Sequence, residues 1–63
     1  MKLNIDNVEL ARARMGITVE QLAKSYGVSR ARMNVILNQR TVTPLCAGRL
    51  AKALAVDVTE IID

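Results

Sequence analysis

The stretch Thr18–Asn38, TVEQLAKSYGVSRARMNVILN, decides how this chain of 63 residues folds. Its spacing predicts two short helices joined by a tight turn at Gly27. Glycine suits this position because it adopts a positive φ without steric cost where a chain leaves a helix at a steep angle. Leu22 is expected on the inner face of the first helix, and Met33 and Ile36 on the inner face of the second.

The residues around the turn support the same arrangement. Ala23 is the small residue at the place where two crossing helices approach closely, and Tyr26 and Val28 flank the turn. Together these positions predict a helix-turn-helix, with a second helix at about residues 29–37. In such a motif the second helix can lie in the major groove of DNA.

A further helix is predicted before this motif. Asp6 and Glu9 have the spacing of a capping box at its start, and Gly16 is well placed to end it. Its inner stripe is expected to consist of Val8, Ala11 and Met15.

Two more helices are predicted after the motif. Thr43 and Pro44 suit the cap and first position of a fourth helix, whose apolar face comprises Leu45, Ala47, Leu50, Ala51, Ala53 and Leu54. Asp57 and Glu60 predict a capping box over a short fifth helix, VTEIID, with a hydrophobic staple between Val56 and Ile61. We therefore expect residues 1–63 to form a single, compact, all-α domain of five helices.

The composition limits the functions that this domain can have. Apolar residues make up 51% of the chain, almost all of them aliphatic, and Tyr26 is the only aromatic residue. This composition argues against the stacking platforms of single-stranded nucleic-acid binders. The net charge of +3 and the pI near 9.6 favour an anionic partner.

Several classes of function find no support in the residues. The chain has no histidine and one cysteine, Cys46, so neither an internal disulfide nor a Cys/His zinc site can form, and we expect no metal or cofactor. Cys46 is expected to be a small buried apolar residue. No glycine-rich phosphate loop or evident carboxylate pair suggests an enzyme. No run has the length of a membrane span and no signal peptide is evident, so we expect a cytoplasmic protein.

The chain resembles the Cro/repressor-type helix-turn-helix regulators of phages and bacteria, over roughly residues 6 to 62. The likeness is carried by LAKALAVDVTEII near the end and by Arg12, Gly16, Leu22, Ala23, Gly27, Val28, Ser29, Met33, Ile36, Asn38 and Pro44. The resemblance implies a lambda-repressor-like fold and a transcriptional regulator that binds specific sequences of double-stranded DNA.

The second helix of the motif carries the side chains expected to contact bases. Arg30 can donate two hydrogen bonds to guanine, and Asn34 can pair with adenine. Ala31 and Val35 suit contact with thymine methyl groups, and in the resembled family the positions of Arg30, Ala31 and Val35 commonly touch bases. The alternatives are a solvated surface role for Arg30 and core packing for Val35.

A second set of residues is expected to contact the DNA backbone. The helix starts at Thr18 and Ser29 present N–H groups that suit phosphate oxygens, and further positions resemble phosphate contacts of the family. The full set is Thr18, Ser29, Arg32, Asn38, Arg40 and Thr41. Contacts of this kind fix register and give an affinity that falls with salt.

Three positions depart from the family pattern. Val19 stands where the family often has a phosphate-binding glutamine, so that anchor is missing. Leu37 replaces a glutamate that commonly pairs with the arginine of the first helix, here Arg12, which must turn to water, to DNA or to a carboxylate such as Glu9 or Glu20. Gln39 replaces a glycine, so the turn there is expected to differ.

Partners follow from the resemblance. Relatives generally bind inverted repeats as twofold dimers, and Val58 and Ile62 are the candidate residues for a homodimer interface, unless they complete the core. Repression by blocking RNA polymerase is the commoner outcome in the family, and activation through contact with RNA polymerase is the other. The alternative from a different class is a protein-interaction module that modulates a partner regulator.

Overall fold

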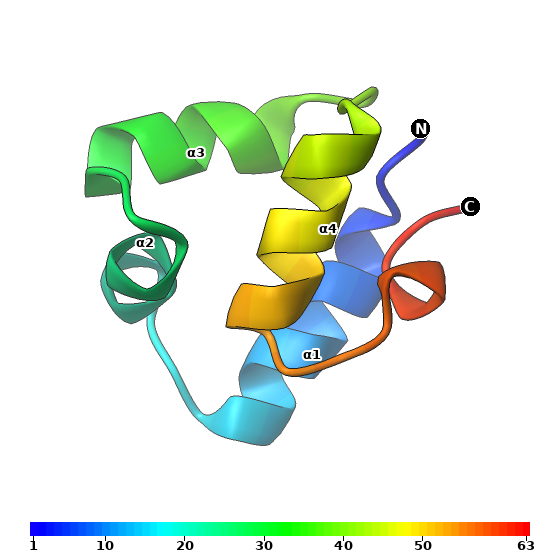
Figure 1. Ribbon diagram of the computed structural model, residues 1–63. Helices are drawn as coiled ribbons and strands as arrows, with labels where there is room; N and C mark the ends of the chain where they lie inside the picture. The colour runs from blue at the N-terminus through cyan, green and yellow to red at the C-terminus, as the bar shows by residue number, and fades with distance from the viewer.

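The computed structural model describes residues 1–63 and contains four α-helices followed by one 3-10 turn. The elements are α1 (Ile5–Met15), α2 (Val19–Tyr26), α3 (Arg30–Asn38), α4 (Pro44–Ala53) and the turn η1 (Val58–Glu60). In Figure 1, α3 lies along the top, α2 lies below its first residues, and α4 descends from the far end of α3 in front of α1. None of these helices combines the length and apolar character needed to cross a membrane.

The predicted helix boundaries of the motif rest on local hydrogen bonds. The side chains of Thr18, Ser29 and Thr43 each accept a hydrogen bond from a backbone N–H three residues further on, which caps α2, α3 and α4. Gly16 and Gly27 end α1 and α2 with φ values of +66° and +98°. A side chain rarely adopts this left-handed region, so glycine is favoured at both ends.

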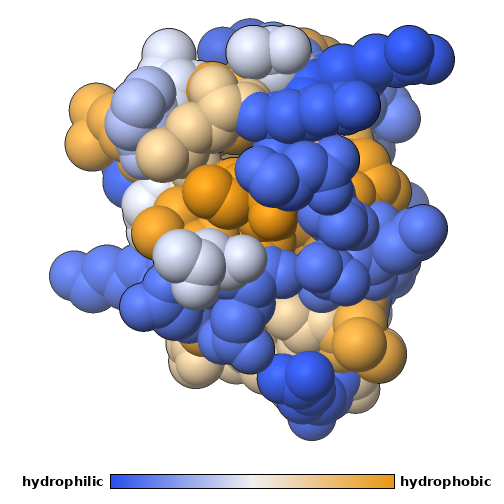
Figure 2. All heavy atoms as spheres, turned by 90° about the vertical axis from the view of Figure 1, so that its right-hand side faces the viewer, coloured by the Kyte–Doolittle hydropathy of each residue, from blue (hydrophilic) through white to orange (hydrophobic).

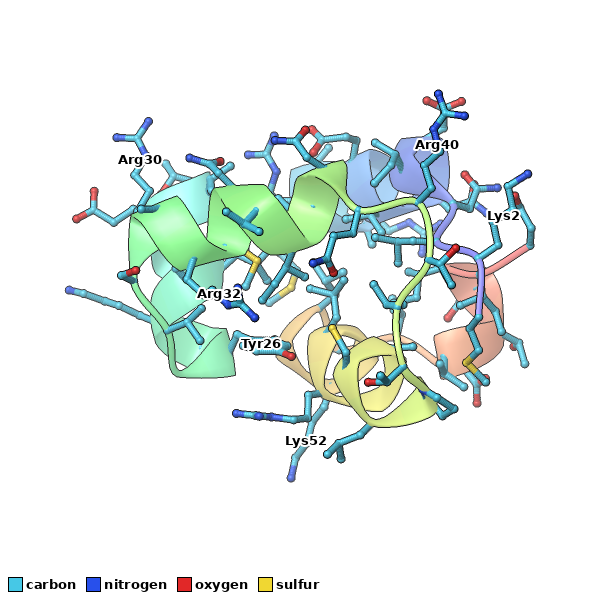
Figure 3. All side chains as sticks on the ribbon, turned by 90° about the horizontal axis from the view of Figure 1, so that it is seen from above. Lys2, Tyr26, Arg30, Arg32, Arg40 and Lys52 are labelled. Atoms are coloured by element: carbon cyan, nitrogen blue, oxygen red, sulfur yellow. The ribbon has the colours of Figure 1, made fainter.

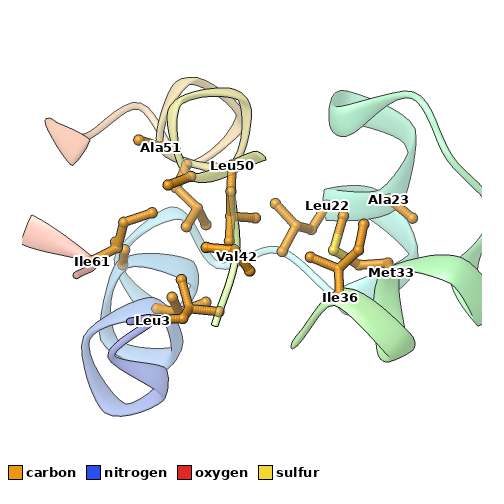
Figure 4. Close-up of a cluster of buried hydrophobic side chains, with 13 residues drawn as sticks. Leu3, Leu22, Ala23, Met33, Ile36, Val42, Leu50, Ala51 and Ile61 are labelled. Carbon is orange, nitrogen blue, oxygen red and sulfur yellow. The ribbon is translucent and has the colours of Figure 1, made fainter. Parts of the chain in front are cut away.

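A single aliphatic core holds the helices together. It consists of Leu3, Val8, Ala11, Leu22, Ala23, Met33, Ile36, Val42, Ala47, Leu50, Ala51, Leu54 and Ile61. Figure 4 shows Leu22 and Met33 meeting between α2 and α3, with Leu50 of α4 beside them. No polar or charged residue is buried, so the core depends on apolar burial rather than on buried ion pairs.

The first residues of the chain join two distant segments. Lys2 forms an isolated antiparallel bridge with Thr41, and Leu3 forms one with Ile62. The backbone N–H of Leu3 donates to the carbonyl of Arg40 at 3.1 Å, and that of residue 4 donates to the carbonyl of Ile61 at 2.8 Å. These bonds fix the loop after α3 against both ends of the chain.

The start and end of α1 differ from the prediction. The cap is Asn4, whose side chain accepts from the N–H of Asn7 at 3.0 Å, so Asp6 lies inside the first turn and the predicted Asp6–Glu9 capping box is wrong. Asn4 takes the cap because its own N–H is already bound in the terminal bridge. Met15 is 44% exposed rather than part of the inner stripe, because the helix ends there and the chain turns away.

Two predictions about the C-terminal part are also wrong. Leu45 is 72% exposed and does not join the core face of α4. The fifth helix is a single 3-10 turn, although the capping box between Asp57 and Glu60 is present. Ile62 explains the short turn, because its pairing with the N-terminal segment draws the chain into an extended conformation. The backbone and side-chain hydrogen bonds from Thr59 lower the pKa of Asp57 below its ordinary value.

Candidate nucleic-acid interface

The helix α3 has one buried face and one exposed face. Met33 is fully buried and Ile36 is 4% exposed, as predicted. The four residues expected to contact bases, Arg30, Ala31, Asn34 and Val35, are all exposed. Val35 is 47% exposed, so core packing does not account for this apolar residue.

The turn between α2 and α3 sets the angle at which α3 leaves the domain. The carbonyl of Ala23 accepts hydrogen bonds from the N–H groups of Gly27 at 2.8 Å and Val28 at 3.0 Å, the pattern that closes a helix around a left-handed glycine. Ser29 then caps α3 by accepting from the N–H of Arg32 at 3.2 Å. Its hydroxyl hydrogen stays free, so the same group can donate to an anion.

The residues expected to bind phosphate lie at three places around α3. Thr18 and Ser29 are the exposed caps of α2 and α3. Asn38 is the last residue of α3, and Arg40 and Thr41 follow in the exposed loop. Figure 3 shows Arg30 and Arg40 pointing to one side of α3, whereas Arg32 points to the other side, toward Tyr26. Arg32 is exposed.

The positive charges near α3 are not neutralised within the chain. The two ion pairs of the structure are Arg12–Glu9 at 2.6 Å and Arg14–Glu60 at 3.8 Å, and both involve α1. Arg30, Arg32 and Arg40 therefore have no carboxylate within 4.0 Å, and this surface keeps a positive potential.

The sequence left open which carboxylate Arg12 contacts, and the structure shows that it is Glu9. One of its amino groups pairs with Glu9, and the other donates to the carbonyl of Ile17 at 3.0 Å. Leu37, in place of a carboxylate partner, is half-buried and packs against the core, and so does Val19. Val19 and Leu37 thus contribute apolar packing, and Glu9 supplies the carboxylate for Arg12.

Gln39 needs no glycine-like conformation. Its φ is −78°, in the extended region that any residue adopts. The chain passes from Gln39 directly into the segment that pairs with the N-terminus.

One residue near this surface was missed in the sequence. The bridge between Lys2 and Thr41 places Lys2 beside the loop that also carries Arg40, and Figure 3 shows Lys2 and Arg40 at the same end of α3. No local signal could have found it, because the pairing joins positions 2 and 41.

The candidate dimer residues are less free than expected. Val58 and Ile62 are both half-buried and pack against the core. Ile62 also pairs with Leu3, so the alternative that these residues complete the core is correct in part. Their role in a dimer interface stays a prediction.

No group of three or more cysteine and carboxylate side chains is arranged to hold a metal ion. Cys46 is half-buried rather than fully buried.

Comparison with known proteins supports the resemblance at the level of the fold. No protein-family model matches the chain, and no curated protein matches it. Among solved structures, the chain is similar to the high-resolution crystal structure of the restriction-modification controller protein C.AhdI from Aeromonas hydrophila. The match has a TM-score of 0.73 and 26% sequence identity, and covers 89% of this chain and 83% of that chain. The resemblance to Cro/repressor-type helix-turn-helix regulators is therefore confirmed, and the solved structure that this chain matches is that of a restriction-modification controller protein.

Proposed function

We propose that this protein is a transcriptional regulator that binds specific sequences of double-stranded DNA, with α3 in the major groove. The observation that carries the proposal is the exposed face of α3, where Val35 is 47% exposed beside Arg30, Ala31 and Asn34. About half of the Val35 side chain has no packing partner within the domain. This exposed apolar surface suits the methyl groups and base edges of a major groove.

The dimensions of α3 suit this role. Nine residues give a helix of about 13 Å, and the major groove is about 12 Å wide and 8.5 Å deep. Arg30 lies in the first turn, which in this class of motif points at the bases. Its guanidinium can donate two parallel hydrogen bonds to O6 and N7 of guanine, while Asn34 can pair with adenine.

Phosphates on both sides of the groove complete the interface. Thr18 and Ser29 present helix N-termini with hydroxyl groups, and Arg40 and Thr41 extend the contact beyond the end of α3. Arg32 points to the opposite side of α3 from Arg30, and we assign it to a phosphate of the other strand. The uncompensated charge of this surface supports such a backbone contact.

The protein is proposed to bind an inverted repeat as a homodimer, with Val58 and Ile62 at or near the interface. One domain covers about half of such a site. Repression by occluding RNA polymerase and activation through contact with it both remain compatible with this geometry. The similarity to a restriction-modification controller protein suggests that the regulated genes include those of a restriction-modification system.

Selection of bound sites from random duplexes tests the proposal. We expect a consensus with two inverted half-sites about one helical turn apart and at least one invariant guanine in each. Recovery of sites with no shared sequence would refute sequence-specific recognition. A consensus without symmetry would instead refute the dimer while leaving DNA binding intact.

A further inference from the structure

A second cationic surface lies between the C-terminal end of α2 and the second half of α4. It is an open hollow of about 530 Å³ lined by Ser25, Tyr26, Arg49, Lys52 and Ala53, which we call the α2–α4 hollow. Figure 3 shows Tyr26 reaching from α2 toward α4, and Lys52 at the opposite edge of the molecule from Arg30. Neither cation of the hollow has a carboxylate within 4.0 Å, since both ion pairs of the structure lie elsewhere.

Arg49 is oriented in this hollow by two contacts with Tyr26. Its guanidinium carbon lies 4.7 Å from the centre of the Tyr26 ring, and its Nη2 donates to the backbone carbonyl of Tyr26 at 3.2 Å. This bond places a positive charge at the C-terminal end of α2, where the helix dipole is negative. It uses only one of the five guanidinium N–H groups. Arg49 is exposed, so the remaining donors are accessible to a ligand. Because the side chain is already ordered, binding a carboxylate costs little further conformational entropy.

The hollow faces a different direction from the proposed DNA surface. In Figure 1, α4 runs away from the level of α3, and Lys52 lies about 12 Å along its axis from Pro44. The major groove is about 8.5 Å deep, and Arg30, which is proposed to enter it, points to the side of α3 away from Tyr26, whereas Arg32 points toward Tyr26. The hollow is therefore displaced from the duplex that α3 enters.

The shape and composition of the hollow favour a peptide over a nucleic acid. Single-stranded binders stack bases on several aromatic side chains, whereas here Tyr26 is the only aromatic residue and one face of its ring is covered by Arg49. Two cations three residues apart on one helix face match two carboxylates on a short segment. Ala53 and the rest of the Tyr26 ring add an apolar floor.

We propose that the α2–α4 hollow binds an acidic segment of a protein partner, with one carboxylate on Arg49 and a second on Lys52. An arginine fork and a tyrosine at the centre of a small depression are the residue types that dominate binding energy at protein interfaces. This contact is independent of DNA binding. It would allow a regulator bound to its site to recruit or be held by a second protein.

The test titrates the full chain with a capped decapeptide of Glu, Asp and Leu, followed by amide chemical shifts. The control peptide has Gln and Asn in place of the acids. We expect shifts confined to residues 25, 26, 49, 52 and 53 with the acidic peptide alone. Arg49→Gln and Lys52→Gln should each weaken this binding about fivefold to tenfold, whereas Lys24→Gln, an exposed cation of α2 outside the hollow, should change it less than twofold.

Three results would overturn the proposal. The first is absence of binding, and the second is a set of shifts spread over Arg30 and Arg40 as well as the hollow. The third is a fall of about one in the salt slope of duplex binding for Lys52→Gln, which would assign the hollow to DNA phosphates. Lys52 makes no hydrogen bond or ion pair through its side chain, so its variant keeps the test decisive even where Arg49→Gln loosens the end of α2. If the unmodified chain did not bind DNA, the proposed regulator would be refuted, but the peptide titration would still test the hollow.

Discussion

Alanine substitution of two neighbouring residues of α3 should have different effects, one on DNA recognition and the other on the stability of the domain. Val35 is 47% exposed and Ile36 is 4% exposed, although they are adjacent in the chain. We predict that Val35→Ala leaves stability almost unchanged and weakens recognition of one base pair. Ile36→Ala should instead destabilise the whole domain.

The magnitudes follow from burial. Val35→Ala removes two carbon groups, worth about 1.6 kcal/mol if fully buried and roughly half of that here. The better helix propensity of alanine returns about 0.5 kcal/mol, so the net change is about 0.3 kcal/mol. Ile36→Ala should cost about 2–5 kcal/mol. A domain of this length has a total stability of roughly 3–9 kcal/mol, so this loss is a large fraction of the whole.

Binding gives the second half of the prediction. If Val35 covers roughly 40 Å² of a thymine methyl group, its truncation costs about 1 kcal/mol, or about fivefold in affinity. Anisotropy titrations would compare the selected duplex with one in which uracil replaces that thymine and so removes the methyl group. The effect of Val35→Ala should disappear on the uracil duplex.

Urea unfolding followed by circular dichroism supplies the stability values. Equal destabilisation by Val35→Ala and Ile36→Ala would show that the exposed face of α3 is wrongly assigned. A stable Val35→Ala variant that still discriminates thymine from uracil as well as the parent protein would remove Val35 from the base contacts.

Four further predictions concern five substitutions. Arg30→Ala should relax the preference at one base pair by about tenfold or more while leaving binding to random duplexes nearly intact; a uniform loss over all sequences would assign Arg30 to a phosphate. Arg32→Ala should weaken specific and random duplexes alike and lower the salt slope by about one, and an unchanged slope would exclude this contact. Gly27→Ala should destabilise the domain by about 1–2 kcal/mol, because φ is +98° although an added Cβ would make only ordinary contacts. Gly48→Ala, in open space within α4, should stabilise the domain by about 0.5–1 kcal/mol. Urea midpoints that move in the same direction for both variants would contradict the assigned backbone. Asp57→Asn should be less stable than the parent at neutral pH, and the difference should vanish as pH falls through the lowered pKa of this carboxylate; a difference that persists at pH 2 would rule out the charge as its cause.

The sequence was sufficient for the central motif because its signals are local. Gly27, Ser29 and the spacing of Met33 and Ile36 each act within a few residues, and the structure reproduces all of them. The same holds for the capping of α4 by Thr43. A pattern that repeats with the helical period identifies the buried face without knowledge of what it packs against.

The errors occurred where distant segments decide the outcome. Asn4 displaced Asp6 as the cap of α1, and the fifth helix shortened to one turn, because residues 2–4 pair with both the loop at residue 41 and the tail at residue 62. The pairing of residues 2–4 leaves no mark in the residues nearby. Leu45 is a different kind of error: it shares the outward face of α4 with Gly48, Arg49 and Lys52, which are all exposed.

The candidate site divides in the same way. The exposure of Arg30, Asn34 and Val35 follows from the helical period and was predictable, whereas the position of Lys2 and the placement of Arg49 on Tyr26 depend on tertiary contacts. The carboxylate for Arg12 was found among the alternatives that the sequence offered, because Glu9 lies three residues away on the same helix.

Methylation interference on the selected duplex addresses the main claim most directly. Guanine N7 lies on the floor of the major groove and adenine N3 in the minor groove, so one dimethyl sulfate reaction reports on both. We predict that methylation at N7 of one guanine in each half-site blocks binding, and that this interference is lost for Arg30→Ala. Interference confined to adenine N3, or identical patterns for the parent protein and Arg30→Ala, would contradict a mode of binding in which α3 reads the major groove.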